Sequence, residues 1–245
     1  MMCRLLGVVA DRPVDLTYWM LEAPRSFRSY SDYHAHGWGM GYYTAGQTHL
    51  IKEPISALKS ERFGPVIQST SAPHYVCHIR KATCGEHTMC NSHPFQSGKF
   101  LFAHNGSVDL DYLKAHLTPE RLKAVEGQTD SELYFQFLLQ GFESNGVNGL
   151  ASAIREIRSR PYTALNFLLS DGNHLFAFWQ QSDSAEPLYP EYYQLYFNDY
   201  TVPNSDIREI VVCSEKLDDT TWRPLPAGSL IQINADLTWN LTPVD

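Results

Sequence analysis

Cys3 stands near the start of the 245-residue chain and opens the largely apolar stretch 3–9. If the two methionines before it are removed, this one residue carries both a thiol and a free α-amine. An α-amine has a pKa of about 7.7–8.0, so it can accept the thiol proton at neutral pH without a partner histidine. The position therefore indicates a nucleophile for acyl transfer, and its alternative is a small residue buried in a strand.

The pair Asn105-Gly106 supplies a second requirement of acyl transfer from an amide. Hydrogen-bond donors must stabilise the oxyanion that forms when the nucleophile attacks. Asn105 offers a side-chain amide after the apolar run 100–104, and Gly106 lets its own N–H approach a substrate closely. Asn-Gly is also a common tight-turn pair. The two interpretations are compatible, because a turn can present both donors.

Arg80 and Asp130 carry the two charges that would recognise an α-amino acid. Arg80 follows the run 75–79, where its guanidinium could clamp a carboxylate through two parallel hydrogen bonds. Asp130 could bind an ammonium group. The alternatives are a surface ion pair for Arg80 and a helix-terminal charge or cap, shared with Thr129, for Asp130. Together the two residues predict recognition of both charged ends of an α-amino acid.

A metal site is the competing interpretation of the segment between these motifs. Cysteine and histidine recur there at every third position, as Cys84, His87, Cys90 and His93. The segment contains no Cys-x2-Cys pair, and its spacing matches no standard zinc finger. We therefore predict no metal at this segment.

Composition narrows the class of protein. The net charge of −8 argues against a nucleic acid or an anionic membrane as partner. No apolar run approaches the ~18 residues of a membrane span, and the N-terminus lacks the pattern of a secretory signal. Five cysteines are an odd number, which favours reduced thiols over a disulfide framework. A cytoplasmic protein with a sizeable core is expected.

Apolar patterning predicts strands on either side of a helical pair. The helical pair is expected at 129–142 and 147–159, and shorter helices at 14–21 and 57–68. Strands are expected at 3–10, 38–44, 49–51, 74–81, 100–104, 163–169, 175–179, 192–197, 209–212 and 230–233. The segment 82–98 is predicted to be a loop. This order favours an α+β layered fold over alternating βαβ units.

Five short motifs follow the N-terminal Met-Cys-Arg in a fixed order. They are HGWG at 36–39, HIRKAT at 78–83, NSHPF at 91–95, HNG at 104–106 and TDSE at 129–132. In this combination the chain resembles the class II glutamine amidotransferases. More narrowly, it is similar to their single-domain branch, which includes predicted amidotransferases of bacteria and the ergothioneine-pathway γ-glutamyl amidohydrolase. The segment 212–217 and Trp222 also fit this branch.

The resemblance implies a fold and a set of roles. The fold is the four-layer α/β/β/α sandwich of N-terminal-nucleophile hydrolases, here as one domain over residues 2–245. Cys3 matches the nucleophile, and Asn105 with Gly106 matches the oxyanion hole. Arg80 matches the ligand of the substrate α-carboxylate, and Asp130 the ligand of its α-amine.

The same resemblance implies that four further residues lie near the pocket. Thr83 and His93 fall in pocket loops, and Arg4 and Trp38 lie beside the nucleophile. The alternatives are core packing for Trp38 and a hydrogen-bonded loop anchor for His93. The branch usually has Asp before Gly-Trp-Gly, and His36 stands there in this chain, so any role of that carboxylate would be lost.

The resemblance implies hydrolysis of the γ-amide of glutamine or of a γ-glutamyl compound. The reaction would pass through a γ-glutamyl thioester and release glutamate with ammonia or an amine. No metal or organic cofactor is needed. An amidotransferase would pass its ammonia to a synthase partner, whereas a stand-alone γ-glutamyl hydrolase would need none.

The start Met1-Met2-Cys3 leaves a further alternative. Methionine trimming generally requires a small second residue, and Met2 is not small. A Cys3 that keeps its methionines would lack the basic amine. The chain would then be a non-catalytic binding or regulatory module that retains the γ-glutamyl pocket.

Overall fold

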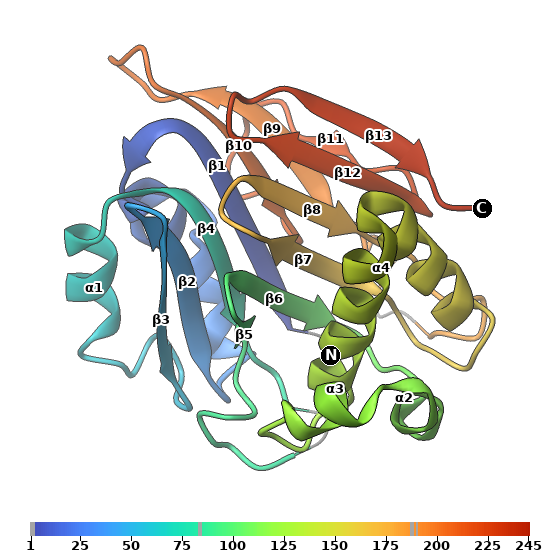
Figure 1. Cartoon of the computed structure of the whole chain (residues 1–245). Helices are drawn as coiled ribbons and strands as arrows, with labels where there is room; N and C mark the ends of the chain where they lie inside the picture. Colours follow the sequence, from blue (N-terminus) through green and yellow to red (C-terminus); the bar gives the residue numbers. More distant parts are fainter. Residues whose placement is uncertain (1–2, 83–84, 187–188, 190) are drawn as a thin grey trace.

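Two antiparallel β-sheets lie face to face, with helices on both outer faces (Figure 1). The computed structural model describes residues 3–82, 85–186, 189 and 191–245. The layers follow the order helix, sheet, sheet, helix. The predicted α+β class and four-layer α/β/β/α sandwich are therefore confirmed.

The first sheet carries the N-terminal strand at its centre. Among the described residues its order is β11-β9-β10-β1-β4-β2-β3. The strands are β1 (Arg4–Val14), β2 (Trp38–Thr44), β3 (Gln47–Glu53), β4 (Ala72–Ile79), β9 (Tyr196–Thr201), β10 (Arg208–Cys213) and β11 (Arg223–Pro224). The second sheet has the order β13-β12-β8-β7-β6-β5. It consists of β5 (Phe95–Ser97), β6 (Phe100–Asn105), β7 (Asn166–Ser170), β8 (His174–Phe178), β12 (Ser229–Asn234) and β13 (Trp239–Pro243).

Helices cover the outer face of each sheet. The π-helix η1 (Tyr18–Glu22), the 3-10 helix η2 (Phe27–Asp32) and α1 (Phe63–Ser69) pack on the first sheet. The second sheet is covered mainly by α4 (Asp130–Arg158), with α2 (Leu110–His116) and α3 (Pro119–Lys123) beside it. Figure 1 shows α4 lying across β6, β7 and β8.

Side-chain alternation divides the core into layers. In β1, Leu5 and Val9 join the cluster between the sheets, whereas Leu6 and Val8 join the cluster under the outer helices. Successive side chains of a strand point to opposite faces, so a strand buried on both faces is apolar throughout. This explains the continuous apolar run that follows Cys3.

Several element boundaries differ from the sequence predictions. The helix predicted at 14–21 is wrong in its first part, because β1 continues to Val14 and only η1 is helical. The strand predicted at 192–197 is shifted, since pairing with β10 begins at Tyr196. The predicted loop 82–98 contains β5, which pairs with β6. The two predicted long helices are both present: they lie within α4 on either side of a kink, where the backbone at Asn145 and Gly146 is not helical.

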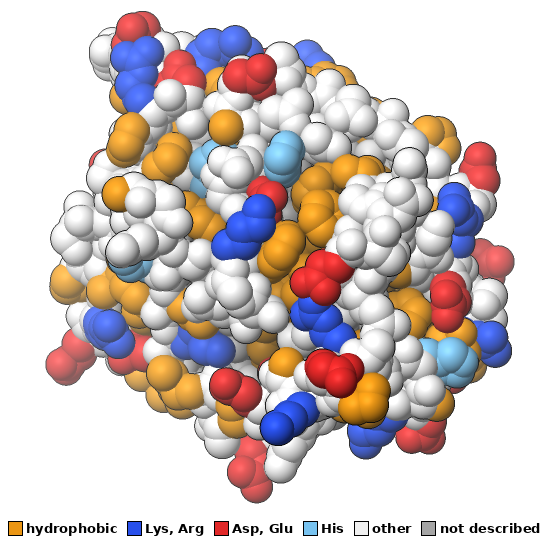
Figure 2. Space-filling model, viewed as in Figure 1, with side chains coloured by type: hydrophobic (Ala, Val, Ile, Leu, Met, Phe, Trp, Pro, Cys, Tyr) orange, Lys and Arg blue, Asp and Glu red, His pale blue; other side chains and the backbone are white. Residues whose placement is uncertain are grey.

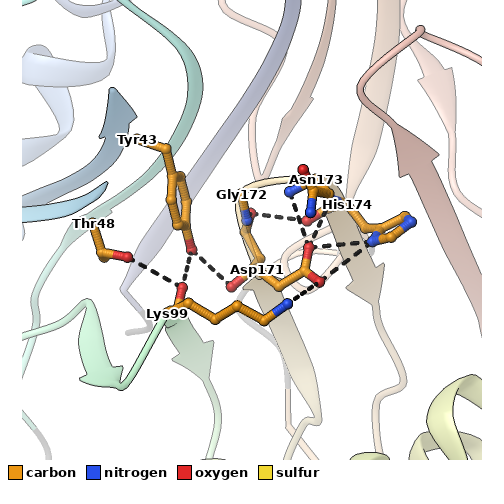
Figure 3. A network of polar contacts seen from close by, with 8 residues as sticks. Tyr43, Thr48, Lys99, Asp171, Gly172, Asn173 and His174 are labelled. Carbon is orange, nitrogen blue, oxygen red and sulfur yellow. Dashed lines mark hydrogen bonds and ion pairs between the residues drawn. The ribbon is translucent and has the colours of Figure 1, made fainter. Parts of the chain in front are cut away.

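A polar network ties the two sheets together at one end of the sandwich (Figure 3). The Tyr43 hydroxyl of β2 lies within hydrogen-bond distance of the carbonyl oxygens of Lys99 and Ser170, at 2.9 and 2.8 Å. Next to it, the Asp171 carboxylate accepts the backbone N–H of His174 at 2.8 Å and pairs with Lys99 Nζ at 3.1 Å. Tyr43 pairs with the start of β4, so this network lies opposite the end that carries Cys3.

The surface in Figure 2 carries acidic and basic side chains interspersed, and neither sign dominates that face. Among the described residues, no helix combines the length and apolar character that crossing a membrane requires.

Candidate active site

Cys3 lies directly before β1, where three strand ends meet. Arg4 pairs with Ile79 across β1 and β4, which brings Cys3 next to the segment that follows β4. The Lys81 backbone N–H donates to Cys3 Sγ at 3.1 Å, and the thiol lies 3.3 Å from the Lys81 carbonyl oxygen. The predicted nucleophile is thus held by main-chain contacts at the end of the sheet.

The thiol of Cys3 is stabilised in its neutral form. Burial raises its pKa above the ordinary value, while the Lys81 N–H and the charges of Arg80 and Arg4 act in the opposite direction. A thiol with a raised pKa stays protonated at neutral pH. A base must therefore remove its proton before it can attack a carbonyl carbon.

Asn105 ends β6 beside the same point. Its Nδ2 donates to the Cys3 carbonyl oxygen at 2.6 Å. Gly106 follows with φ +143°, and a Cβ there would lie 1.9 Å from the Ala164 carbonyl oxygen. Only glycine therefore fits at position 106, where the backbone packs against Ala164 and lines the same pocket as Cys3.

A small pocket brings together five of the predicted site residues, namely Cys3, Arg80, His93, Gly106 and Asp130. Arg80 and Asp130 are 3% and 8% exposed, so opposite charges lie in a largely desolvated space. Desolvated charges discriminate strongly between substrates, because an unmatched partner leaves a buried charge unpaired. The remaining lining residues are Lys81, Ala82, His104, Thr129 and Ser131.

Backbone contacts hold the two charged side chains in place. Arg80 Nη1 donates to the Glu86 carbonyl oxygen at 3.1 Å. The Asp130 carboxylate accepts the N–H groups of Val108 and Ser131, both at 2.9 Å. Capping of α4 falls instead to Thr129, whose hydroxyl accepts the Glu132 N–H. Asp130 is thus fixed at the helix start but oriented towards the pocket.

His104 and Ser131 are pocket residues to which the sequence analysis assigned no role. His104 Nε2 lies 3.2 Å from the Ala164 carbonyl oxygen, so Nε2 carries the proton and donates. Nδ1 then accepts from the Ser131 hydroxyl at 2.9 Å. Burial lowers the pKa of His104, which keeps this neutral tautomer. His104 belongs to the HNG motif and Ser131 to the TDSE motif. Membership of these motifs was the sequence feature that could have indicated a place in the pocket.

His93 lines the pocket next to a second buried histidine. The rings of His78 and His93 are 4.2 Å apart, and burial lowers the pKa of both. Neither ring nitrogen of His93 has a hydrogen-bond partner among the described residues. A Cβ at Gly39 would lie 2.1 Å from the His93 carbonyl oxygen, which explains the last glycine of the HGWG motif.

Three predicted residues that the structure describes are not among those lining this pocket, namely Asn105, whose contact with Cys3 is given above, Trp38 and Arg4. Trp38 is buried under the outer helices, where its Nε1 donates to Glu53 at 3.0 Å. Arg4 contacts the Cys3 carbonyl oxygen through Nη1 at 3.1 Å, but its guanidinium pairs with Glu215 at 2.7 Å. Thr83 lies outside the described residues.

His36 holds the loop that follows Lys81. Its Nδ1 accepts the Ala82 N–H at 2.9 Å, and its ring stacks on His87 at 4.2 Å. A carboxylate at this position could accept the same N–H. The substitution of His for the usual Asp therefore preserves a hydrogen-bond acceptor next to the pocket. Within the described residues, no three His, Cys, Asp or Glu side chains are arranged to hold a metal ion.

Comparison with known proteins decides the family. The family profile described as glutamine amidotransferases class-II matches residues 2–242. This chain belongs to the class II glutamine amidotransferases. The glutamine amidotransferase-like protein YafJ of Escherichia coli is 26% identical to it, with 93% of this chain and 95% of YafJ covered.

Solved structures agree with this family at the level of the fold. A glutamine aminotransferase class-II domain protein from Silicibacter pomeroyi superposes with a TM-score of 0.72 at 22% identity, over 98% of this chain and 99% of its own. Glutamine phosphoribosylpyrophosphate amidotransferase from Bacillus subtilis gives a TM-score of 0.68 at 15% identity. That match covers 99% of the chain described here and 49% of the Bacillus chain.

Proposed function

We propose that the chain hydrolyses the γ-amide of glutamine or of a γ-glutamyl compound, with Cys3 as nucleophile. The observation that carries the proposal is the shared pocket of Cys3, Arg80 and Asp130. Arg80 would bind the α-carboxylate of the substrate and Asp130 its α-ammonium. The γ-carbonyl would then lie at Cys3 Sγ.

The chemistry follows from the raised pKa of the thiol. The α-amine of a freed Cys3 takes the thiol proton, and the thiolate forms a C–S bond to the γ-carbon. Asn105 Nδ2 and the Gly106 N–H stabilise the oxyanion. The C–N bond breaks, and ammonia or an amine leaves with the proton held by the Cys3 amine. Water then hydrolyses the γ-glutamyl thioester and releases glutamate.

Two versions of this function differ in whether the ammonia passes to an acceptor or is simply released. The Bacillus subtilis phosphoribosylpyrophosphate amidotransferase has as much chain again beyond the part that matches here. By analogy, ammonia would pass to an acceptor on a synthase partner. Turnover of γ-glutamyl amides without any partner would favour a stand-alone hydrolase.

The test compares a protein that begins at Cys3 with the full printed chain and with the Cys3→Ala variant. Each is incubated with a glutamine-derived diazoketone, and the adduct is mapped by mass spectrometry beside an assay of glutamate release. We expect turnover and a single adduct on Cys3 only when its amine is free. Labelling of Cys77, Cys84, Cys90 or Cys213 with Cys3 untouched would refute the assignment. A natural protein with a blocked Cys3 and no turnover would support the non-catalytic module instead.

A further inference from the structure

A second, larger pocket lies beside the nucleophile, and we call it the tyrosine pocket. It has a volume of about 540 Å³, within the range of small-molecule sites. Its walls include four tyrosines from η2, the turn after it and the segment near residue 190, together with Arg4 and His34. The tyrosines are Tyr30, Tyr33, Tyr189 and Tyr192. Among the residues that the structure describes, it shares no lining residue with the pocket of Arg80 and Asp130.

Two connections join the tyrosine pocket to Cys3. Arg4, in its wall, donates from Nη1 to the Cys3 carbonyl oxygen at 3.1 Å. Lys81 donates its backbone N–H to Cys3 Sγ, and its Nζ donates to the Tyr33 carbonyl oxygen at 3.0 Å. Cys3 therefore stands between the two pockets. A substrate whose α-groups lie at Arg80 and Asp130 must extend its leaving amine past Cys3, away from those charges.

The guanidinium of Arg4 serves as a fixed wall of this pocket. It pairs with Glu215 at 2.7 Å, contacts the Tyr189 hydroxyl at 3.1 Å, and lies 5.6 Å from the ring centres of both Tyr30 and Tyr192. Its charge is thus already balanced by Glu215. What the pocket offers to a ligand is mainly aromatic surface.

Two polar groups in the tyrosine pocket remain available to a ligand. His34 is 3% exposed, and its Nδ1 has no hydrogen-bond partner among the described residues. Burial lowers the pKa of His34 to about 3, so its ring is neutral. The Asp32 side chain is exposed and has no hydrogen bond or ion pair within the described part of the chain. A buried polar atom without a partner is costly unless a ligand or water satisfies it.

We propose that the tyrosine pocket binds the amine half of the substrate, and that this half is an amine whose chain carries an aromatic ring with a polar substituent. The proposal rests on the function proposed above and specifies its substrate class. Aromatic rings pair favourably with tyrosine rings in offset or edge-to-face geometry. His34 and Asp32 would bind the polar substituent. Glutamine, whose leaving group is ammonia, would leave the pocket empty.

The test compares γ-glutamyl tyramide with γ-glutamyl methylamide on the protein that begins at Cys3. We expect kcat/KM to be at least tenfold higher for the tyramide, and Tyr33→Ala and Asp32→Asn each to reduce this ratio by about threefold to tenfold. Tyr33 is 65% exposed, so its removal should not disturb folding. Leu122→Ala, at an exposed position of α3, is the control and should leave the ratio unchanged.

Glutamine turnover separates the two proposals. A ratio near one, with normal hydrolysis of glutamine, would overturn the tyrosine pocket and leave the catalytic function standing. Binding of tyramine to the Cys3→Ala variant, measured by calorimetry, is independent of catalysis. Binding that Tyr33→Ala abolishes would support the pocket, and no binding at millimolar tyramine would refute it and favour a protein partner at this face.

Discussion

The backbone N–H of Lys81 donates to Cys3 Sγ at 3.1 Å, although the two residues are 78 positions apart in the sequence. This contact places the predicted nucleophile against the segment that carries Arg80 and Ala82. Any movement of that segment would therefore change both the position of the thiol and the shape of the pocket.

Arg80 and Asn105 should affect different kinetic constants. Arg80→Ala removes a charged contact present in both ground and transition states, so we expect mainly a higher KM for glutamine. If Asn105 is the proposed oxyanion donor, Asn105→Ala should lower kcat by roughly a hundredfold to a thousandfold. Steady-state kinetics separates the two effects. Asn166→Ala is the matched control, because Asn166 pairs with Asn105 across the sheet but donates to Tyr193. A normal kcat with a raised KM for Asn105→Ala would reverse the roles.

Asp130 should select substrates with a free α-amine. Acetylation removes the positive charge and adds bulk, so kcat/KM for N-acetylglutamine should be about tenfold to a hundredfold below that for glutamine. Asp130→Asn should shrink this difference. Glu132→Gln makes the same charge change two residues along α4, where the carboxylate accepts the N–H groups of Glu126 and Gly127. Equal turnover of both substrates by the unmodified enzyme would remove Asp130 from the site.

His36 should stabilise the protein only while its ring is neutral. Its pKa is lowered by burial first and then by the charges of His87 and Lys81. A folded-state pKa below the unfolded value means that the contribution is complete above about pH 6.5 and is lost as pH falls through the folded pKa. Denaturant unfolding should therefore show a difference between wild type and His36→Ala that shrinks in acid. His36→Asp keeps an acceptor for the Ala82 N–H. Its free energy of unfolding should therefore stay above that of His36→Ala down to a lower pH than the wild-type value does.

Asp171 should contribute to stability without affecting catalysis. Burial favours its protonated form, but the N–H groups of Asn173 and His174 and the Lys99 ammonium outweigh burial and lower its pKa (Figure 3). Asp171→Ala should reduce the free energy of unfolding by about 1–3 kcal/mol at neutral pH. The loss should be complete above the unfolded pKa of about 3.9, shrink below it, and disappear only as pH falls through the lower folded pKa, where protonation removes the interaction. Exposed Asp236 serves as control, and a changed kcat/KM for Asp171→Ala would contradict the prediction.

The sequence by itself determined the family, the layered fold and the residue types of the site. Strand and helix periods, each short motif and the Met-Cys-Arg start depend on neighbours within a few positions, and the order of the motifs can be read directly along the chain. The boundaries that failed, at the end of β1, at β9 and at β5, are set by which residues pair with a neighbouring strand, and the apolar pattern of the segment itself does not encode that.

Only the tertiary structure decided which side chains share a pocket. Trp38 pairs with Ile79 on β4 and faces the outer helices with it, although it belongs to the same motif as His36. His104 and Ser131 meet because β6 ends beside the start of α4. Arg4 turns its guanidinium towards Glu215, where it forms part of the wall of the tyrosine pocket. Each of these placements depends on strand register and sheet packing, since a side chain one position along a strand points to the opposite face.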